Sequence, residues 1–416
     1  MKKTIILIFM TLLLSSISYA SECSRTVACN CGDTLIESKE LSIFDNLNYC
    51  LGEFALKVEN DNVEISCFEG EITSGHINPI VSGILVSGDN FSIKNCNISG
   101  FYNAVEIHNS NLGLIYNNSF NHNFASGLEL VNSNFYNISN NVMNNNSWDG
   151  IFLINSSNNN IYNNTLRYNT IDGIQIFYGS YNNLISKNDM VGNLGHAIAP
   201  IVCNNFIDDN NIGGNGKSIR YIENQNNIEI SNTNEFSEII FCNVNNSKIS
   251  NVVLDNKENK NDGILLVNSN NNEILNSDFL NLRAGIYLFN SYNNKIENNL
   301  FENNQFALRF MDSSNNQINL NSFNDNDIFF YFNNSNENTF SLNNIYDLGF
   351  NLDYNAYSQI YLDENLKISL QGNISIEIGE KISQEPLFKF SFLLFIGVFF
   401  FLIFLILIFF FIFKKS

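Results

Sequence analysis

The segment GIFLINSSNNNIYNNTLRYN, residues 150–169, decides the fold because close copies of it return along the chain. The copies begin at Gly127, Gly263 and Gly285 and read GLELVNSNFYNISNNVMNNN, GILLVNSNNNEILNSDFLNL and GIYLFNSYNNKIENNLFENN. Neighbouring copies are 22 to 24 residues apart. A fixed period in this range is typical of a small structural unit stacked on copies of itself.

Apolar residues return at four fixed offsets in each unit, and polar or small residues separate them. The first offset holds Val105, Leu128, Ile151, Ile174, Ile264, Ile286 and Leu308. The second holds Ile107, Leu130, Leu153, Ile176, Leu266, Leu288 and Phe310. The third holds Ile115, Ile138, Ile161, Leu184, Ile274, Ile296 and Ile318, and the fourth Phe120, Met143, Leu166, Phe279, Phe301 and Phe323.

This alternation has period 2 over short runs, which predicts strands and not helices. Three short strands joined by tight turns complete one coil, and stacked coils form parallel sheets with equivalent residues about 4.8 Å apart. We therefore predict a parallel β-helix. A leucine-rich repeat has a similar period, but it needs several leucines and a helical segment per unit, and Gly, Asn and Ser punctuate these units too often for that.

Asparagine also recurs in register. Asn117, Asn140 and Asn163 are 23 residues apart, and Asn276 and Asn298 are 22 apart. Asparagine tolerates left-handed turn conformations, and amides stacked in a column can bond along it. We interpret these residues as structural.

The composition limits the partners. The net charge is −20, and only five of the 21 basic residues are arginine, which argues against nucleic acid as a partner because phosphates need a basic surface. Binding of a divalent cation is the alternative use of this acidity, but the acidic residues are scattered and no calcium-loop motif supports it, so we predict no metal site and no cofactor.

Both ends of the chain look like membrane signals. Residues 1–20 combine two lysines, a short apolar run and a small-residue site at Ala20, which predicts a cleaved secretion signal. Residues 391–413 are 23 uncharged, mostly apolar residues followed by Lys414 and Lys415, which predicts a membrane span with the body outside the cytoplasm. The removed tail of a lipid-anchor signal is the alternative.

These patterns divide the chain into seven parts. They are a signal peptide (1–20), a Cys-rich N-terminal cap with first strands (21–80), a first block of coils (81–212), a second block (213–350), closing strands and a linker (351–387), a transmembrane helix (388–413) and a cytoplasmic tail (414–416).

All eight cysteines fall on the exported side, where disulfides are expected. Six cluster near the start, and their connectivity is open: Cys23, Cys29, Cys31, Cys50, Cys67 and Cys96. Cys203 and Cys242 can pair across coils or remain buried thiols. Nine N-x-S/T sequons mark candidate glycosylation sites: Asn97, Asn117, Asn137, Asn145, Asn155, Asn163, Asn245, Asn333 and Asn373.

The motifs resemble a known family. CGDTLIESKELSIFDNLNYC from Cys31, DNVEISCFEGEITSG from Asp61, the repeated GI-x-L-x-NS-x-NN units and GNGKSIRYIENQNNIEIS from Gly214 are similar to right-handed parallel β-helix repeat proteins of the NosD type, which share their architecture with pectate lyases. The resemblance implies a right-handed, single-stranded coil. It also implies a role in copper-enzyme maturation as one option, although histidine and methionine are few and spread out.

One column could carry chemistry. Asp149, Asp172 and His196 each precede the start of a unit, 23 and 24 residues apart, and Trp148 lies beside them. Polysaccharide-acting sites use paired carboxylates as acid and base, and an aromatic ring stacks on sugars. The alternative is turn chemistry, since Asp before Gly recurs at Asp262. We interpret the remaining histidines, His76, His108 and His122, as isolated surface or turn residues.

Three functions remain open. The first is a membrane-anchored, extracytoplasmic β-helix that serves as a structural or carbohydrate-binding module at the cell surface or in the periplasm. The second is a polysaccharide lyase, hydrolase or epimerase. The third is a NosD-like maturation factor.

Overall fold

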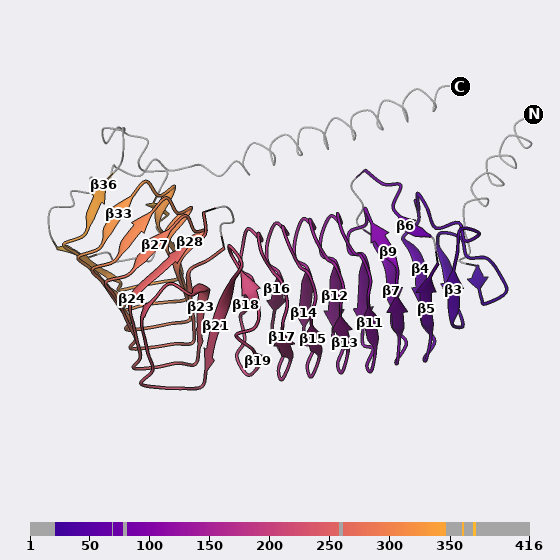
Figure 1. Ribbon diagram of the computed structural model, residues 1–416, viewed down its shortest axis with the longest axis horizontal. Coiled ribbons are helices and arrows are strands. Elements are labelled where there is room, and N and C mark those ends of the chain that lie inside the picture. Colours follow the sequence, from indigo (N-terminus) through magenta and orange to yellow (C-terminus); the bar gives the residue numbers. More distant parts are fainter. Residues whose placement is uncertain are drawn as a thin grey trace, which may run out of the picture. The chain divides into compact units, whose positions relative to one another are not determined.

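The computed structural model describes residues 21–68, 70–77, 81–257 and 261–346, and the strands at 360–361 and 369–371 (Figure 1). Every regular element in this part of the chain is a β-strand, and strands of successive coils lie side by side in parallel sheets. The predicted parallel β-helix is confirmed.

Two sheets run through the first half of the chain. The nine-stranded sheet contains, in spatial order, β1 (Glu22–Cys23), β2 (Asp33–Leu35), β4 (Phe54–Val58), β7 (Ser82–Val86), β10 (Val105–His108), β12 (Leu128–Val131), β14 (Ile151–Ile154), β16 (Ile174–Ile176) and β18 (Ile198–Pro200). The eight-stranded sheet contains β19 (Phe206–Ile207), β17 (Leu184–Ser186), β15 (Asn160–Tyr162), β13 (Asn137–Ser139), β11 (Leu114–Tyr116), β8 (Ser92–Lys94), β5 (Glu64–Cys67) and β3 (Lys39–Leu41). A short sheet pairs β6 (Glu71–Thr73) with β9 (Asn97–Ser99).

The second half builds its own sheets. One contains β20 (Ile212–Gly213), β21 (Lys217–Glu223), β23 (Phe236–Cys242), β25 (Ile264–Val267), β28 (Ala284–Phe289), β31 (Phe306–Met311), β34 (Ile328–Asn333) and β37 (Ile360–Tyr361). The other contains β36 (Asn344–Tyr346), β33 (Ser322–Asn324), β30 (Leu300–Glu302), β27 (Asp278–Leu280), β24 (Lys248–Asp255), β26 (Glu273–Leu275), β29 (Lys295–Glu297), β32 (Gln317–Asn319), β35 (Thr339–Ser341) and β38 (Ser369–Gln371), with β22 (Glu229–Thr233) also paired to β24.

The break between the halves falls at the glycine-rich stretch where the repeat pattern loosens. The first two sheets end at β18 and β19, and β20 pairs antiparallel with β21 before parallel pairing resumes. We call the coils before and after this break the first and second block. In the region predicted as an N-terminal cap with the first strands, β1 to β5 already belong to these sheets, because they pair in parallel with one another and with the coils that follow.

The register confirms the predicted core columns, with one correction. Ile138 pairs with Ile161, and the rings of Phe279, Phe301 and Phe323 stack at centroid spacings of 5.0 Å. Leu184, however, is 46% exposed, and Ile185 holds the core position opposite Ile161. The assignment was wrong by one residue because this coil is one residue longer than its predecessor.

Asparagines hold the corners of the coils in two ways. Exposed ones adopt positive φ and bond along their column, as Asn117 does to Asn95 over 2.8 Å. Buried ones form ladders that the sequence pattern did not single out. In one of them, Asn118, Asn141, Asn164, Asn188 and Asn211 are joined by amide–amide bonds of 3.0 to 3.1 Å. Each also bonds backbone groups of neighbouring coils, so these turns are fully paired in the interior.

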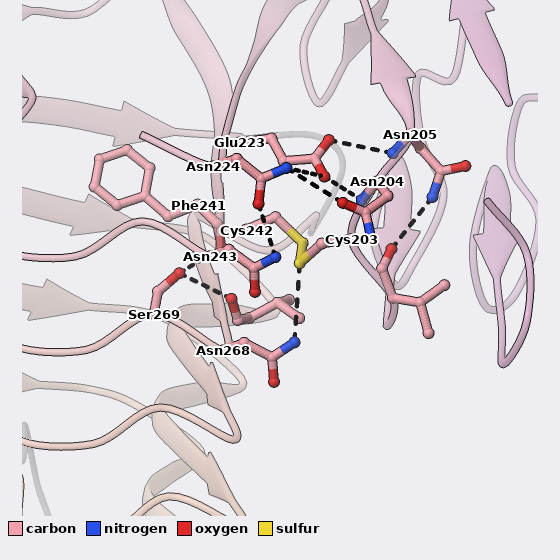
Figure 2. The surroundings of a disulfide bond; sticks show 12 residues. Cys203, Asn204, Asn205, Glu223, Asn224, Phe241, Cys242, Asn243, Asn268 and Ser269 are labelled. Atoms are coloured by element: carbon pink, nitrogen blue, oxygen red, sulfur yellow. Dashed lines mark hydrogen bonds between the residues drawn. A yellow bond between two sulfur atoms is a disulfide. The ribbon is translucent and has the colours of Figure 1, made fainter. Parts of the chain in front are cut away.

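All eight cysteines form disulfides: Cys23–Cys29, Cys31–Cys50, Cys67–Cys96 and Cys203–Cys242. The last joins the first block to the second. Figure 2 shows its surroundings, where Glu223 accepts hydrogen bonds from the backbone N–H groups of Asn204 and Asn205. This carboxylate supplies the acceptors that a following coil would otherwise offer.

The predicted signal peptide, the transmembrane helix and the tail lie outside the described residues, as do most of the predicted closing strands and linker. Within the described part of the chain, no helix is long and apolar enough to span a bilayer.

Candidate functional site

The predicted column is a real column, but it is buried. Asp149, Asp172 and His196 are 1%, 3% and 3% exposed. Oδ1 of Asp149 accepts the backbone N–H of Asp172 at 2.9 Å, and Oδ1 of Asp172 accepts that of His196 at 2.6 Å. These carboxylates therefore bond the next coil from inside the structure, and the turn interpretation accounts for both of them.

His196 continues the column into the second block. Its Nδ1 lies 2.7 Å from Oε1 of Glu238, and its Nε2 lies 2.9 Å from Oδ2 of Asp262. Asp262 in turn accepts two hydrogen bonds from Arg283, at 2.8 and 2.7 Å. We call His196, Glu238, Asp262 and Arg283 the junction network. It ties the last coil of the first block to the second.

Burial and charge act in opposite directions on the network. Burial lowers the pKa of His196, but the charge of Asp262 and hydrogen bonds to Asp262 and Glu238 outweigh it and raise that pKa to about 10. Burial raises the pKa of Glu238 to about 6, against the effect of His196. The imidazolium form of His196 is thus favoured at neutral pH, as expected for a charge between two carboxylates.

A different set of residues lies within reach of solvent. Glu106 on β10 and Glu129 on β12 are register partners, so their side chains leave the same face of adjacent strands. The side chain of Glu106 is 24% exposed and that of His108 is 36% exposed. We call Glu106, Glu129, His108, Tyr102 and Trp148 the carboxylate face.

Each carboxylate has its own partners. Glu106 accepts a hydrogen bond from Oγ of Ser82, and its Oε1 lies 2.5 Å from Nε2 of His108. Glu129 accepts a hydrogen bond from Nδ2 of Asn103 at 2.5 Å. Ser82 and Asn103 occupy the same offset as Asp149, three and two coils earlier respectively. Towards the N-terminus, the column that contains Asp149 and His196 therefore supplies hydrogen-bond donors to the two glutamates of the carboxylate face.

These partners move the two pKa values in opposite directions. The hydrogen bond from His108 lowers the pKa of Glu106 despite partial burial. Burial, followed by the charge of Glu106, raises the pKa of Glu129. A pair of carboxyl groups split in this way can hold one proton donor and one proton acceptor side by side.

A pair of aromatic rings adjoins the carboxylates through Tyr102. The ring of Trp148 is 40% exposed and meets Tyr102 edge to face at a centroid distance of 5.4 Å. The charges of Glu129 and Glu106 add to burial in raising the pKa of Tyr102, which shows that its hydroxyl lies in their field. The exposed indole of Trp148 offers an apolar surface, and Tyr102 connects it to the two carboxylates, which offer polar anchors.

The sequence pointed to Trp148 but missed Glu106 and Glu129. His108, which we interpreted as isolated, contacts Glu106, whereas His76 and His122 are exposed. The available signal was the 23-residue spacing of the two glutamates, at an offset where other units carry Phe152 and Gln175. Five sequon asparagines of the first block are exposed: Asn137 begins strand β13, and Asn117, Asn145, Asn155 and Asn163 lie at corners with positive φ.

Comparison with known proteins identifies the family. The family described as "Right handed beta helix region" matches residues 82–235 and 235–373, well over half of the 416 residues. The chain belongs to the right-handed β-helix family. The comparison with curated proteins found no match to this chain.

Solved structures are similar at low identity. They include the catalytic domain of a GH87 α-1,3-glucanase in complex with nigerose (13% identity, TM-score 0.30, 84% of this chain and 62% of that one) and the pectate lyase Pel9A (14%, 0.30, 74% and 70%). A double mutant of the periplasmic alginate epimerase AlgG is a third (14%, 0.37, 82% and 85%). The β-helix chain thus spans less than two thirds of the glucanase domain, and at these TM-scores the similarities carry no inference about activity.

Proposed function

We propose that this β-helix protein is an extracytoplasmic carbohydrate-binding module, and that the carboxylate face is its binding surface. One observation carries the proposal: Glu106 and Glu129 are register partners on adjacent strands, Tyr102 lies near both of them, and the exposed indole of Trp148 packs against the ring of Tyr102. Sugars present an apolar ring face and a polar rim of hydroxyl groups. Aromatic rings suit the first and carboxylates accept hydrogen bonds from the second.

The proposed location is the outer side of a membrane. The predicted signal peptide and the uncharged segment 391–413 support an anchored protein, and four disulfides agree with an oxidising compartment. A NosD-like role in copper-enzyme maturation is the alternative that the sequence resemblance implies; the described residues include no group of three or more His, Cys, Asp or Glu arranged to hold a metal ion.

A glycan array probed with the full chain in detergent tests the proposal. We expect binding to a defined subset of glycans, and its loss in Trp148→Ala. Phe135, which is 55% exposed at a corner earlier in the same coil, provides the matched control as Phe135→Ala. Binding to no glycan, or equal binding by both variants, would overturn the proposal.

A second candidate is a glycan-cleaving enzyme with the same two glutamates, and the opposite pKa shifts of Glu106 and Glu129 favour it. Glu129 would donate a proton to the leaving oxygen, and Glu106 would act as the nucleophile or base. New reducing ends or unsaturated products, released by the wild type and absent in Glu129→Gln, would show that the protein is an enzyme. Binding without products keeps it a module.

A further inference from the structure

A cavity of about 640 Å³ opens where the two blocks meet. The first block contributes Tyr178 and Val202 to its lining, and the second contributes Asn268, Phe289 and Asp312, among others. None of these residues belongs to the carboxylate face or to the junction network. The volume lies within the range of about 300 to 1,000 Å³ that small-molecule sites occupy.

A covalent bond joins the two blocks beside the cavity. Val202 precedes Cys203, which is bonded to Cys242 of the second block, and Nδ2 of Asn268 lies 3.9 Å from Sγ of Cys203 (Figure 2). The asparagine column crosses the junction near this disulfide, because Asn224 of the second block donates to Asn204 of the first at 3.3 Å, and Asn243 donates to Asn224 at 2.9 Å. The two blocks are thus joined next to Val202 and Asn268, which line the cavity.

One wall is a column of planar polar groups. Asn268, Asn290 and Asp312 hold equivalent corners of three successive coils, at φ values of 49°, 49° and 50°. Asn290 donates to Asn268 and accepts the hydroxyl of Tyr292 at 2.7 Å, and Asp312 accepts Nδ2 of Asn334 at 2.6 Å. These bonds fix the amide and carboxylate planes, so the wall is preorganised for hydrogen bonding.

Aromatic and aliphatic groups supply the apolar part. Tyr178 is 61% exposed, and its ring meets Phe177 edge to face at 4.3 Å, which limits its freedom. Phe289 and Val202 are half-buried. Among the described residues that line the cavity, none is Lys or Arg, and Asp312 is the one charged group. An anionic ligand would find no counter-charge here.

We propose that this cavity is a second carbohydrate site, which takes a neutral sugar ring with its apolar face toward Tyr178 and Phe289 and its hydroxyl groups toward the asparagine column. An amphipathic ring matches a cavity that is apolar on one side and lined with fixed amides on the other, and the negative charge of Asp312 selects against uronates. The inference goes beyond the proposed function because its residues are independent of the carboxylate face.

Titration calorimetry of the full chain in detergent tests it, with cellotriose, maltotriose, N-acetylated chitotriose and trigalacturonate as probes. We expect a neutral trisaccharide to bind and trigalacturonate to bind at least tenfold more weakly. Tyr178→Ala should weaken the neutral probe at least tenfold, whereas Tyr178→Phe should retain it. Tyr168, 52% exposed and outside the cavity, gives the matched control Tyr168→Ala, which should bind as the wild type does.

The outcomes separate this proposal from the proposed function. Binding that Trp148→Ala abolishes and Tyr178→Ala leaves unchanged would place the sugar on the carboxylate face alone and overturn the second site. Binding of trigalacturonate in preference to every neutral probe, or no binding of any neutral probe, would overturn it as well. If Tyr178→Ala abolishes binding and Trp148→Ala has no effect, the sugar binds in the cavity and not on the carboxylate face.

Discussion

His196 of the first block lies between Glu238 and Asp262 of the second, 2.7 Å from one carboxylate and 2.9 Å from the other, and its side chain is 4% exposed. A charge this well enclosed is stable only while its partners stay in place. The contact of His196 with Asp262 is therefore both an ion pair and a link between the two blocks.

The link predicts a loss of stability in alkali. The pKa of His196 is about 10 in the folded chain and about 6.5 in an unfolded one, so its contribution is complete below pH 6.5 and is lost as pH rises toward 10. The raised pKa of Glu238 acts in the same direction, with its contribution lost as pH rises through about 6. Asp262, Arg283, Tyr287 and Asp172 also face this group, and the lowered pKa of Asp262 matters only in acid.

Comparison with His196→Gln isolates the histidine. The wild type should exceed the variant in stability near pH 6, and the difference should shrink by up to about 5 kcal/mol toward pH 10.5, since one pKa unit is worth about 1.4 kcal/mol. Thermal unfolding at a series of pH values measures it. A difference that stays constant with pH would show that His196 is neutral in the folded chain.

Much of this architecture was readable from the sequence, because each core column repeats one residue type at one offset. The strand pairing of Ile138 with Ile161 followed from the period alone. The alignment of Asp149, Asp172 and His196 followed too, but their burial did not, since periodicity fixes a residue's height in the stack and not the direction of its side chain.

Two features escaped prediction for physical reasons. Glu238 is 42 residues from His196, across a break where the spacing is irregular, so no period linked them. Glu106 and Glu129 face outward, where packing does not constrain residue type, and their relationship depends on partners such as Ser82 and Asn103 that only the folded chain brings together.

The buried asparagine ladder should be costly to interrupt. Asn164 receives both the backbone and side-chain N–H groups of Asn141 and donates to Ile138 O and to Asn188. Asn164→Ala leaves these buried groups unpaired, and at about 1 to 3 kcal/mol for each unpaired group we expect a loss of at least 3 kcal/mol.

Its exposed neighbour provides the control. Asn163 has a φ of 55°, which glycine adopts freely, so Asn163→Gly should change stability by less than about 1 kcal/mol. Equilibrium unfolding in urea compares the two variants. Equal losses would refute a special role for the buried ladder.

The Cys203–Cys242 disulfide should stabilise the junction more than the N-terminal disulfide stabilises its turn. It closes a loop of 39 residues, against 6 for Cys23–Cys29. Loop-closure entropy predicts losses of about 4 and about 2 kcal/mol for the respective double Ser variants. Unfolding of Cys203→Ser/Cys242→Ser and Cys23→Ser/Cys29→Ser measures both, and a larger loss in the second would contradict the prediction.

The opposite pKa shifts of Glu106 and Glu129 predict that the charge of this surface changes with pH. Because burial and Glu106 raise the pKa of Glu129, this group gains a proton first as pH falls, whereas Glu106 stays ionised beside His108. Carbon-detected NMR of the carboxyl groups should show Glu129 titrating above Glu106. The reverse order would contradict the roles of Glu129 as proton donor and Glu106 as nucleophile or base in the second candidate function.

The most direct test of glycan recognition is a binding isotherm for the best glycan from the array, measured with the full chain and with Trp148→Ala, Glu129→Gln and Phe135→Ala. We predict that the first two changes weaken binding at least tenfold and that Phe135→Ala binds as the wild type does. Unchanged affinity in both Trp148→Ala and Glu129→Gln would show that the carboxylate face does not bind the sugar.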